Sequence, residues 1–323
     1  MISFKVGHPF GKVYEENADI YSSLGDGHAH PDAGAVEFRY KGEILLLDEG
    51  YSLMKLTSNQ NVLTFDDGSI GQYGESMWYN GYLSLVEKGT SRLVASDFSN
   101  KFGYEYLAGN ISRMYPLSTN VNLHIRHLIW IKKKYLIVID DVKFNNGTKR
   151  KVVSNWHGKA NGRITLTSVS GKEIETLYNG TNAGYVLFSR SSSLSLCSYS
   201  GIQNILNYGG SEYISHLRIE TCDEVNSVVL EAFFIPFGHN ESFHELKKPF
   251  VVDVSERKRK ITFVNEFELE LDLDAMSVFV VDWDLVAAIS FSIPFSILIA
   301  FCLFCVIAFV FIFSLLPMNQ KTK

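Results

Sequence analysis

The sequence predicts an all-β protein: a large antiparallel β-sandwich (a supersandwich) in residues 1–280, followed by one C-terminal transmembrane helix. Aromatic residues make up 13% of the chain, with 23 Phe and 16 Tyr, and these residue types favour strands over helices. No long amphipathic helix precedes the tail, and many β-rich runs at regular spacing indicate a sandwich or a large antiparallel barrel. The turn signals that separate these runs are Asn146-Gly147, Asn179-Gly180 and Gly209-Gly210.

The centre of the chain predicts a strand that leads into a hairpin. "VNLHIRH" (residues 121–127) alternates apolar and polar residues, which is typical of a half-buried strand. "HLIWIKKKYLIVIDDV" (residues 127–142) has two β-rich runs around a lysine-rich turn and therefore predicts a hairpin. Within it, His124 and His127 are interpreted as core or surface residues rather than ligands. Further strands are predicted in residues 227–237, 249–256, 259–273 and 276–283.

The tail predicts one membrane crossing. Residues 285–316 contain no charged residue, and about 20 apolar residues are enough to span a bilayer. Asp282 and Asp284 precede this run, and Lys321 and Lys323 follow it. The positive-inside rule then places the short tail, residues 317–323, in the cytoplasm and the globular domain on the extracytoplasmic side. The expected protein is a single-pass membrane protein.

Charge and cysteine content narrow the classes of function. The net charge of −5 argues against a nucleic-acid-binding protein, because these usually carry a basic excess. Four cysteines do not form a disulfide framework, and Cys197 and Cys222 can pair only if they meet in space. The basic run "SERKRK" (residues 255–260) is interpreted as a solvated hairpin end, with binding of an anionic polysaccharide as the alternative. No phosphate-binding loop or nucleophile elbow is present.

Polar residues cluster in "GDGHAHPDAG" (residues 25–34). His28, His30 and Asp32 occupy alternate positions, so on an extended chain they face the same side. Two imidazoles and a carboxylate suit a zinc site; alternatively, one histidine binds metal while the other transfers protons. Asp48 closes a buried strand, where its carboxylate can be a metal ligand or can orient one. The remaining alternative is that all four are turn residues with ordinary hydrogen bonds.

This stretch resembles the C-terminal module of the heparinase II/III family of polysaccharide lyases, which includes heparinase II and the oligoalginate lyases. The family's first element stands here as "HAHPDAGAVEFRYKGEILLLDEGY". A second element stands as "QNVLTFDDGSIGQYG", and a third as "RHLIWIKKKYLIVIDDV", with Arg126 leading. The resemblance covers roughly residues 8–160. Beyond them the strands are similar only in character.

The resemblance implies a fold, a reaction and a set of roles. Members combine an α/α toroid with an antiparallel β-sandwich and cleave uronic-acid polysaccharides by β-elimination. His28 matches the catalytic histidine of the β module, and His30 and Asp48 match ligands of a structural zinc ion. Asp32 is expected to support their loop. Gln60 stands where the family has its third zinc-binding histidine; water, His124, His127 or His157 could replace that ligand, or the site could be empty.

The expected function is therefore that of a membrane-anchored module of a polysaccharide lyase acting on an acidic polysaccharide, with zinc as cofactor. The helical toroid is missing from this sequence. We expect the chain to be a fragment, to work with a separate toroid chain, or to have lost cleavage. The alternative function is a non-catalytic module, derived from the same family, that binds carbohydrate or assembles with a partner.

Overall fold

The computed structural model describes residues 1–6, 30–47, 54–77, 90–192, 194–207, 210–238, 241, 248–264 and 266–282. Within them the regular elements are antiparallel strands and two short 3-10 helices, η1 (Thr57–Asn59) and η2 (Leu117–Thr119), which confirms the all-β prediction. The strands are β1 (Ile2–Phe4), β2 (Val36–Tyr40), β3 (Glu43–Leu46), β4 (Met54–Lys55), β5 (Leu63–Phe65), β6 (Ser76–Met77), β7 (Thr90–Ser99), β8 (Tyr104–Arg113), β9 (Val121–Ile131), β10 (Tyr135–Phe144), β11 (Val152–Lys159), β12 (Arg163–Val169), β13 (Glu173–Asn179), β14 (Ala183–Ser191), β15 (Leu196–Asn207), β16 (Gly210–Thr221), β17 (Ser227–Gly238), β18 (Phe250–Ser255), β19 (Lys258–Phe263), β20 (Phe267–Asp272) and β21 (Ser277–Asp282).

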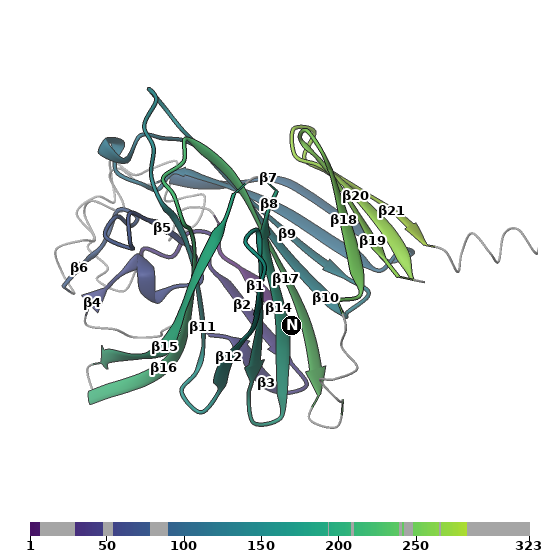
Figure 1. Ribbon diagram of the computed structural model, residues 1–323, viewed down its shortest axis with the longest axis horizontal. Coiled ribbons are helices and arrows are strands. Elements are labelled where there is room, and N and C mark those ends of the chain that lie inside the picture. Colours follow the sequence, from purple (N-terminus) through teal and green to yellow (C-terminus); the bar gives the residue numbers. More distant parts are fainter. Residues whose placement is uncertain are drawn as a thin grey trace, which may run out of the picture.

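The strands form three packed layers, and the middle layer is one large sheet. That sheet has eight strands in the order β12-β13-β14-β17-β10-β9-β8-β7. The sheets β15-β16-β11-β5 and β1-β2-β3 share a hydrophobic core with one of its faces. The four-stranded sheet β18-β19-β20-β21 shares a second core with the other face. Figure 1 shows this last sheet beside strands β7 to β10, at the right of the view.

The central strands are buried on both faces, because they lie in the middle layer. In β10, Leu136 and Val138 belong to one core, while Ile137 and Ile139 belong to the other. The prediction that "VNLHIRH" is half-buried is therefore wrong: from His124 onward β9 is buried on both sides. The predicted hairpin is confirmed, with β9 and β10 antiparallel.

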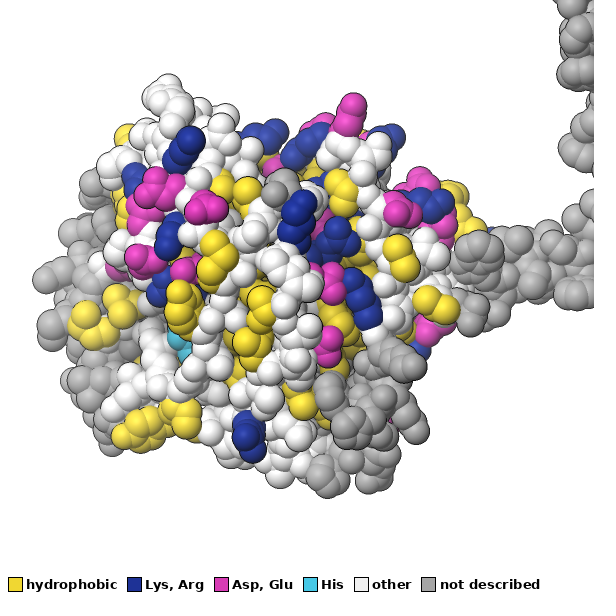
Figure 2. Space-filling view, viewed as in Figure 1, with side chains coloured by type: hydrophobic (Ala, Val, Ile, Leu, Met, Phe, Trp, Pro, Cys, Tyr) yellow, Lys and Arg dark blue, Asp and Glu magenta, His cyan; other side chains and the backbone are white. Residues whose placement is uncertain are grey.

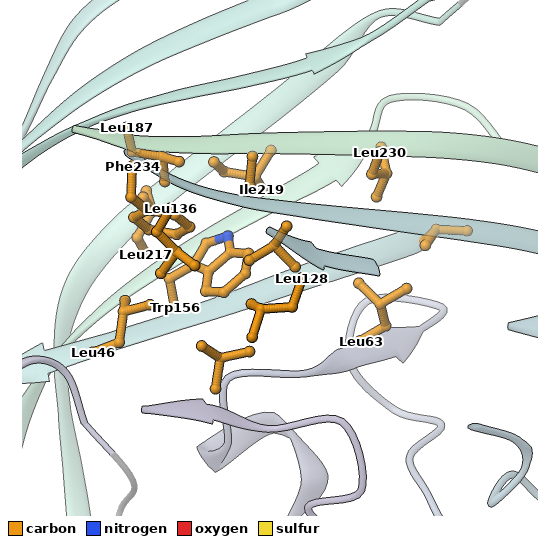
Figure 3. Close-up of a cluster of buried hydrophobic side chains, with 14 of the residues drawn as sticks. Leu46, Leu63, Leu128, Leu136, Trp156, Leu187, Leu217, Ile219, Leu230 and Phe234 are labelled. Atoms are coloured by element: carbon orange, nitrogen blue, oxygen red, sulfur yellow. The ribbon is translucent and has the colours of Figure 1, made fainter. Parts of the chain in front are cut away.

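Trp156 lies in the middle of the first core. Its ring meets the ring of Phe234 edge-on at a centroid distance of 4.9 Å, and only 1% of the residue is exposed. Figure 3 shows Leu128 and Leu136 beside it. Replacing a buried tryptophan by alanine typically costs about 3–5 kcal/mol of stability, so this contact contributes strongly to the joining of the two sheets.

Two arginines of the run "SERKRK" join the outer layer to the central sheet. Arg257 donates to Asp141 of β10, and Arg259, only 2% exposed, pairs with the buried Glu231 of β17. The run does form the end of the β18–β19 hairpin, but its interpretation as solvated is wrong for Arg259, which is buried, and Arg257 is only partly exposed. The interpretation is correct for Lys258, whose side chain is 72% exposed.

A disulfide joins Cys197 of β15 to Cys222, which follows β16. The Cα atoms are 5.3 Å apart, within the range that a disulfide requires. Cys197 and Cys222 therefore meet in space, which was the condition for their pairing.

The predicted transmembrane segment, residues 285–316, lies outside the described residues. Within the part that the structure describes, no helix is long and apolar enough to cross a membrane.

Candidate functional site

The structure describes three of the five residues predicted for the site. His30 is half-buried in the segment that precedes β2. Asp32 is 3% exposed and forms an ion pair with Lys5, and Gln60 is fully buried after η1. The other two, His28 and Asp48, lie outside the described residues. The catalytic and metal-binding roles given to these residues stay predictions.

Asn61 links the strands that surround the predicted site. Its Nδ2 donates to the carbonyl oxygens of Val36, at 2.9 Å, and Leu47, at 3.0 Å. Its Oδ1 accepts a 2.7 Å hydrogen bond from the backbone N–H of His157. Both amide hydrogens are used, so the orientation of the carboxamide is fixed. Asn61 thereby joins β2, the end of β3 and β11. In the sequence it directly follows Gln60, and its partner Leu47 directly precedes Asp48.

His157 lies directly against this asparagine. The backbone N–H of Leu47 donates to the carbonyl oxygen of His157 at 2.9 Å, so the segment entering Asp48 runs alongside it. The ring Nδ1 of His157 is 3.3 Å from Asn61 Oδ1. Since that oxygen can only accept, the proton lies on Nδ1 and Nε2 keeps its lone pair. Nε2 is buried and has no hydrogen-bond partner at normal geometry among the described residues; the side chain of Gln203 and the backbone of Ser58 are the hydrogen-bonding groups near the ring.

A second histidine stacks on the first. The rings of His157 and His216 are 4.4 Å apart and nearly parallel, at 12°. His216 Nε2 lies 3.1 Å from Asn155 Oδ1, and Asn155 uses its amide hydrogens on Val62 and Thr64. The proton of His216 is therefore on Nε2.

Burial keeps both rings neutral near pH 7. It lowers the pKa of His157 well below the usual value, helped by His216, while Gln203 and the backbone of Ser58 oppose the shift. Burial, with a smaller contribution from Arg218, lowers the pKa of His216 to about 4. A neutral imidazole with a free nitrogen can accept a proton or bind a metal ion.

Arg126 ties the same segments to the central sheet. Its Nε and Nη2 pair with the two carboxylate oxygens of Asp140, at 2.8 and 2.9 Å. Its Nη1 donates to the carbonyl oxygens of Gly34, at 2.7 Å, and Asn61, at 2.6 Å. One wholly buried guanidinium therefore contacts two of the chain segments that carry predicted site residues: the segment after Asp32 and the segment after Gln60.

The carboxylate of Asp140 stays charged beside this arginine. Burial alone would raise its pKa, but Arg126 and His124 together keep the pKa well below its usual value. His124 contributes through Nε2, 2.8 Å from Asp140 Oδ1.

Gly34 allows the close approach of the site segment to β8. Its φ is +86°, and a Cβ atom there would collide with Ile111. The positive φ favours glycine here, and any Cβ would also require the end of the Ile111 side chain to shift.

Two of the three histidines considered as substitutes for the missing ligand have other roles. His124 is occupied by Asp140. His127 lies on the opposite side of β9, where its Nδ1 is 2.9 Å from the hydroxyl of Tyr106 and its ring contacts the second core. Only His157 borders both the Gln60–Asn61 pair and the segment that enters Asp48. Within the described ranges, no three His, Cys, Asp or Glu side chains are close enough to share a metal ion.

The profile of the C-terminal domain of heparinase II/III-like proteins matches residues 13–205. That is more than half of the chain. The chain belongs to the heparinase II/III-like family. The resemblance inferred from the three motifs is thereby confirmed. No curated protein sequence matches the chain.

Solved structures of the heparinase II/III-like family share the fold. A heparinase III gene product with methylated lysines has a TM-score of 0.56 and 15% identity, over 87% of this chain and 38% of that one. A mutant of the heparan sulfate lyase HepC from Pedobacter heparinus gives 0.53 and 15%, over 80% and 37%. HepC itself gives 0.51 and 16%, over 80% and 38%. The chain spans less than two fifths of the length of these proteins.

The sequence did not single out several residues that organise this site. In the sequence, Asn61 is simply the residue after Gln60 in the second motif, and Asp140 is one residue of a predicted hairpin. Asn155 and His216 gave no signal at all. Arg126 and Asp140 are direct partners in the β9–β10 ladder. Such a buried pair can be recognised only when the register of the two strands is known.

Proposed function

We propose that the chain is the β module of a membrane-anchored polysaccharide lyase that cleaves uronic-acid-containing glycans by β-elimination. In this reaction a base removes the proton at C5 of the uronate. The bond from C4 to the glycosidic oxygen breaks, a C4–C5 double bond forms, and an acid protonates the departing oxygen. The charge that develops beside the uronate carboxylate must be stabilised. We assign the histidine role in proton transfer to His28.

The observation that carries this proposal is the rigid support beneath the predicted site. Arg126 and Asn61 together contact the segments that lead from Asp32, into Asp48 and from Gln60. A catalytic group needs its supporting residues fixed to a fraction of an ångström. Buried charged and amide groups with all their hydrogen bonds satisfied meet that requirement better than an apolar loop does.

Zinc is proposed as a structural ion of this site, with His30 and Asp48 as ligands. His157 is the residue that fits the position left by Gln60. Its Nε2 is buried with an available lone pair, and Asn61 accepts from the other ring nitrogen. An outer hydrogen bond of this kind is the usual companion of a metal-binding histidine. A bound zinc ion would fix the loops around His28; proton transfer is assigned to the histidine itself.

Metal content tests this assignment. The full chain, purified without chelator, is expected to carry about one zinc ion, the content that a single site would give. His30→Ala and His157→Ala should both lose it. His127→Gln, a matched change of a buried histidine on the other side of β9, should keep it. Zinc that persists in His157→Ala would exclude His157 as a ligand.

We further propose that residues 285–316 anchor the module and that a helical toroid completes its cleft. The apolar length of that segment supports the anchor. The full chain is then expected in the membrane fraction after alkaline extraction, and a chain ending at residue 282 in the soluble fraction. Equal partitioning of the two would contradict the anchor.

Cleavage itself is tested through His28. The full chain, combined with a toroid module, should release unsaturated products from an acidic glycan. His28→Ala should lower the rate on the order of 100-fold with folding intact. An unchanged rate would remove the catalytic assignment. If the wild-type chain binds glycan but does not cleave it, the module is a non-catalytic binding domain. The glutamine at position 60, where the family has a zinc-binding histidine, favours this second function.

A further inference from the structure

Two hollows on the protein surface meet at Arg113, at the end of β8. The first, about 220 Å³, is lined by Thr90, Arg92 and Asn110 together with Arg113. The second, about 620 Å³, includes Tyr73 and, from the segments beyond η2 and β10, Asn120 and Asn145. We call the two together the Arg113 groove.

The groove carries positive charge that no described carboxylate balances. Arg92 and Arg113 are both exposed, and neither forms an ion pair with any residue that the structure describes. No aspartate or glutamate is among the described residues that line either hollow. On the face seen in Figure 2, by contrast, Lys and Arg side chains are interspersed with Asp and Glu. In a chain of net charge −5, such a place attracts anions.

Arg218 shows the contrast. It lines another hollow, of about 320 Å³, beside Tyr199 and His216. Its guanidinium already donates to Glu220 and to Asp67, so its charge is balanced within the protein. Compared with the hollow at Arg218, the Arg113 groove is therefore the one with charge available for a ligand.

Strand pairing places the backbones of Arg92 and Arg113 close together on neighbouring strands. Arg92 lies opposite Asn110, and Thr90 lies opposite Arg113, in the β7–β8 ladder. These two register positions are two residues apart along β7, or about 7 Å. Neighbouring anionic groups on one sugar chain can occupy both positions. Tyr73 and the amides of Asn120 and Asn145 add the flat ring and neutral hydrogen-bonding groups that sugar hydroxyls require.

Hydrogen bonds link a segment that lines the groove to the segment that carries His30 and Asp32. The backbone N–H of Tyr73 donates to the carbonyl oxygen of Met114 at 2.7 Å, which places this segment against the end of β8. Its neighbour Gln72 binds both backbone groups of Ala33, at 3.0 and 2.8 Å. Ala33 follows Asp32 in the segment that carries His30. The segment that lines the groove is therefore tied, through these buried hydrogen bonds, to the segment that carries His30.

We propose that the Arg113 groove binds an anionic sugar residue of the glycan, through the carboxylate of a uronate or through a sulfate ester, at a distance from the bond that is cut. This inference rests on the proposed function for its choice of ligand. Arg92 and Arg113 act as binding residues only, and neither takes part in proton transfer.

The test is binding of the full chain to three hexasaccharides, measured by calorimetry. These are an alginate fragment with carboxylates only, a heparan sulfate fragment with carboxylates and sulfates, and a neutral maltohexaose. Arg113→Gln is expected to weaken binding of an acidic fragment roughly tenfold, and Arg92→Gln by a smaller factor, because each removes a charged hydrogen-bond donor. Maltohexaose should bind weakly to all variants.

Arg163→Gln is the matched control. Arg163 is exposed, begins β12 and lies on the opposite edge strand of the same eight-stranded sheet. Its replacement should leave binding unchanged. Equal affinities of wild type, Arg92→Gln and Arg113→Gln would overturn the inference, and so would the absence of any binding to the acidic fragments. Binding of both acidic fragments identifies the carboxylate as the recognised group; binding of the sulfated fragment alone identifies the sulfate.

These outcomes are separate from those of the cleavage test. Loss of cleavage in His28→Ala with unchanged binding by the groove variants would keep the lyase function and exclude the groove. Groove-dependent binding without His28-dependent cleavage would keep the groove in a non-catalytic module.

Discussion

Asn61 shows how one amide can determine the geometry of a site built from distant segments. Its four hydrogen-bonding positions are directed at β2, the end of β3 and β11, and these partners lie up to 96 residues away from it in the chain. Aspartate would lack the two donors, and serine would not reach across. The residue is 1% exposed, so any group left without a partner would stay away from water.

Asn61→Ala is expected to destabilise the protein by roughly 3–5 kcal/mol. The change leaves the carbonyl oxygens of Val36 and Leu47 and the N–H of His157 without this partner in a buried place, at about 1–3 kcal/mol for each group. Urea unfolding of the full chain measures the loss. Asn161→Ala is the control, since that exposed side chain makes one hydrogen bond, to Thr181, and should cost less than about 0.5 kcal/mol. Similar losses in the two variants would contradict the special role of Asn61.

At the same scale, the sequence indicates candidate chemical groups for the site but not the residues that support them. The pattern His28, His30, Asp32 and the family motif identified candidate groups from residue type alone. The partners of Asn61 could not be inferred, because they are backbone groups that any sequence would supply. Likewise, the stacking of His157 on His216 depends on their being direct partners in the β11–β16 ladder, which no local pattern encodes.

The β9–β10 hairpin is the element that joins the site to the central sheet. Its sequence predicted the two strands and the turn at Lys132–Lys134 correctly, because β-rich runs and a polar turn are local signals. It did not predict that both faces are buried, since that depends on the two outer layers. The polar residues that alternate with apolar ones in "VNLHIRH" include Arg126, which is buried and pairs with Asp140 instead of facing solvent.

Arg126→Met is expected to cost about 3–5 kcal/mol, because it leaves the carboxylate of Asp140 buried with only His124 beside it. Loss of the donors to Gly34 and Asn61 should also speed amide hydrogen exchange in residues 30–36 and 57–65, measured by mass spectrometry. The exposed Arg163→Met serves as control and should change neither quantity. Destabilisation without faster exchange in these segments would show that the arginine supports the core but does not position the site.

At the scale of the whole molecule, three layers determine which charged groups lie inside. The outer sheet β18–β21 packs on the face of the central sheet that carries His127. Two of its arginines, Arg257 and Arg259, form ion pairs with Asp141 and Glu231 of the central sheet. The sheet β15-β16-β11-β5 contains His157 and His216. Ionisable groups are therefore buried on both sides of the central sheet, and the fold's stability should depend on pH through all of them together.

The stability of the full chain is expected to fall as the pH is lowered from 7 to 5. Burial lowers the pKa of His127 and of His216 to about 4 each, and that of His157 well below its usual value. In the unfolded chain these rings titrate near pH 6.5, so below that pH the unfolded state binds more protons and gains stability relative to the folded state. Each histidine contributes up to about 1.4 kcal/mol per pH unit, and the three together on the order of 2–6 kcal/mol at pH 5. Urea midpoints at pH 7, 6 and 5 measure the slope. His127→Gln should reduce it by about a third, whereas a midpoint that does not change between pH 7 and 5 would mean that these rings are not buried as neutral groups.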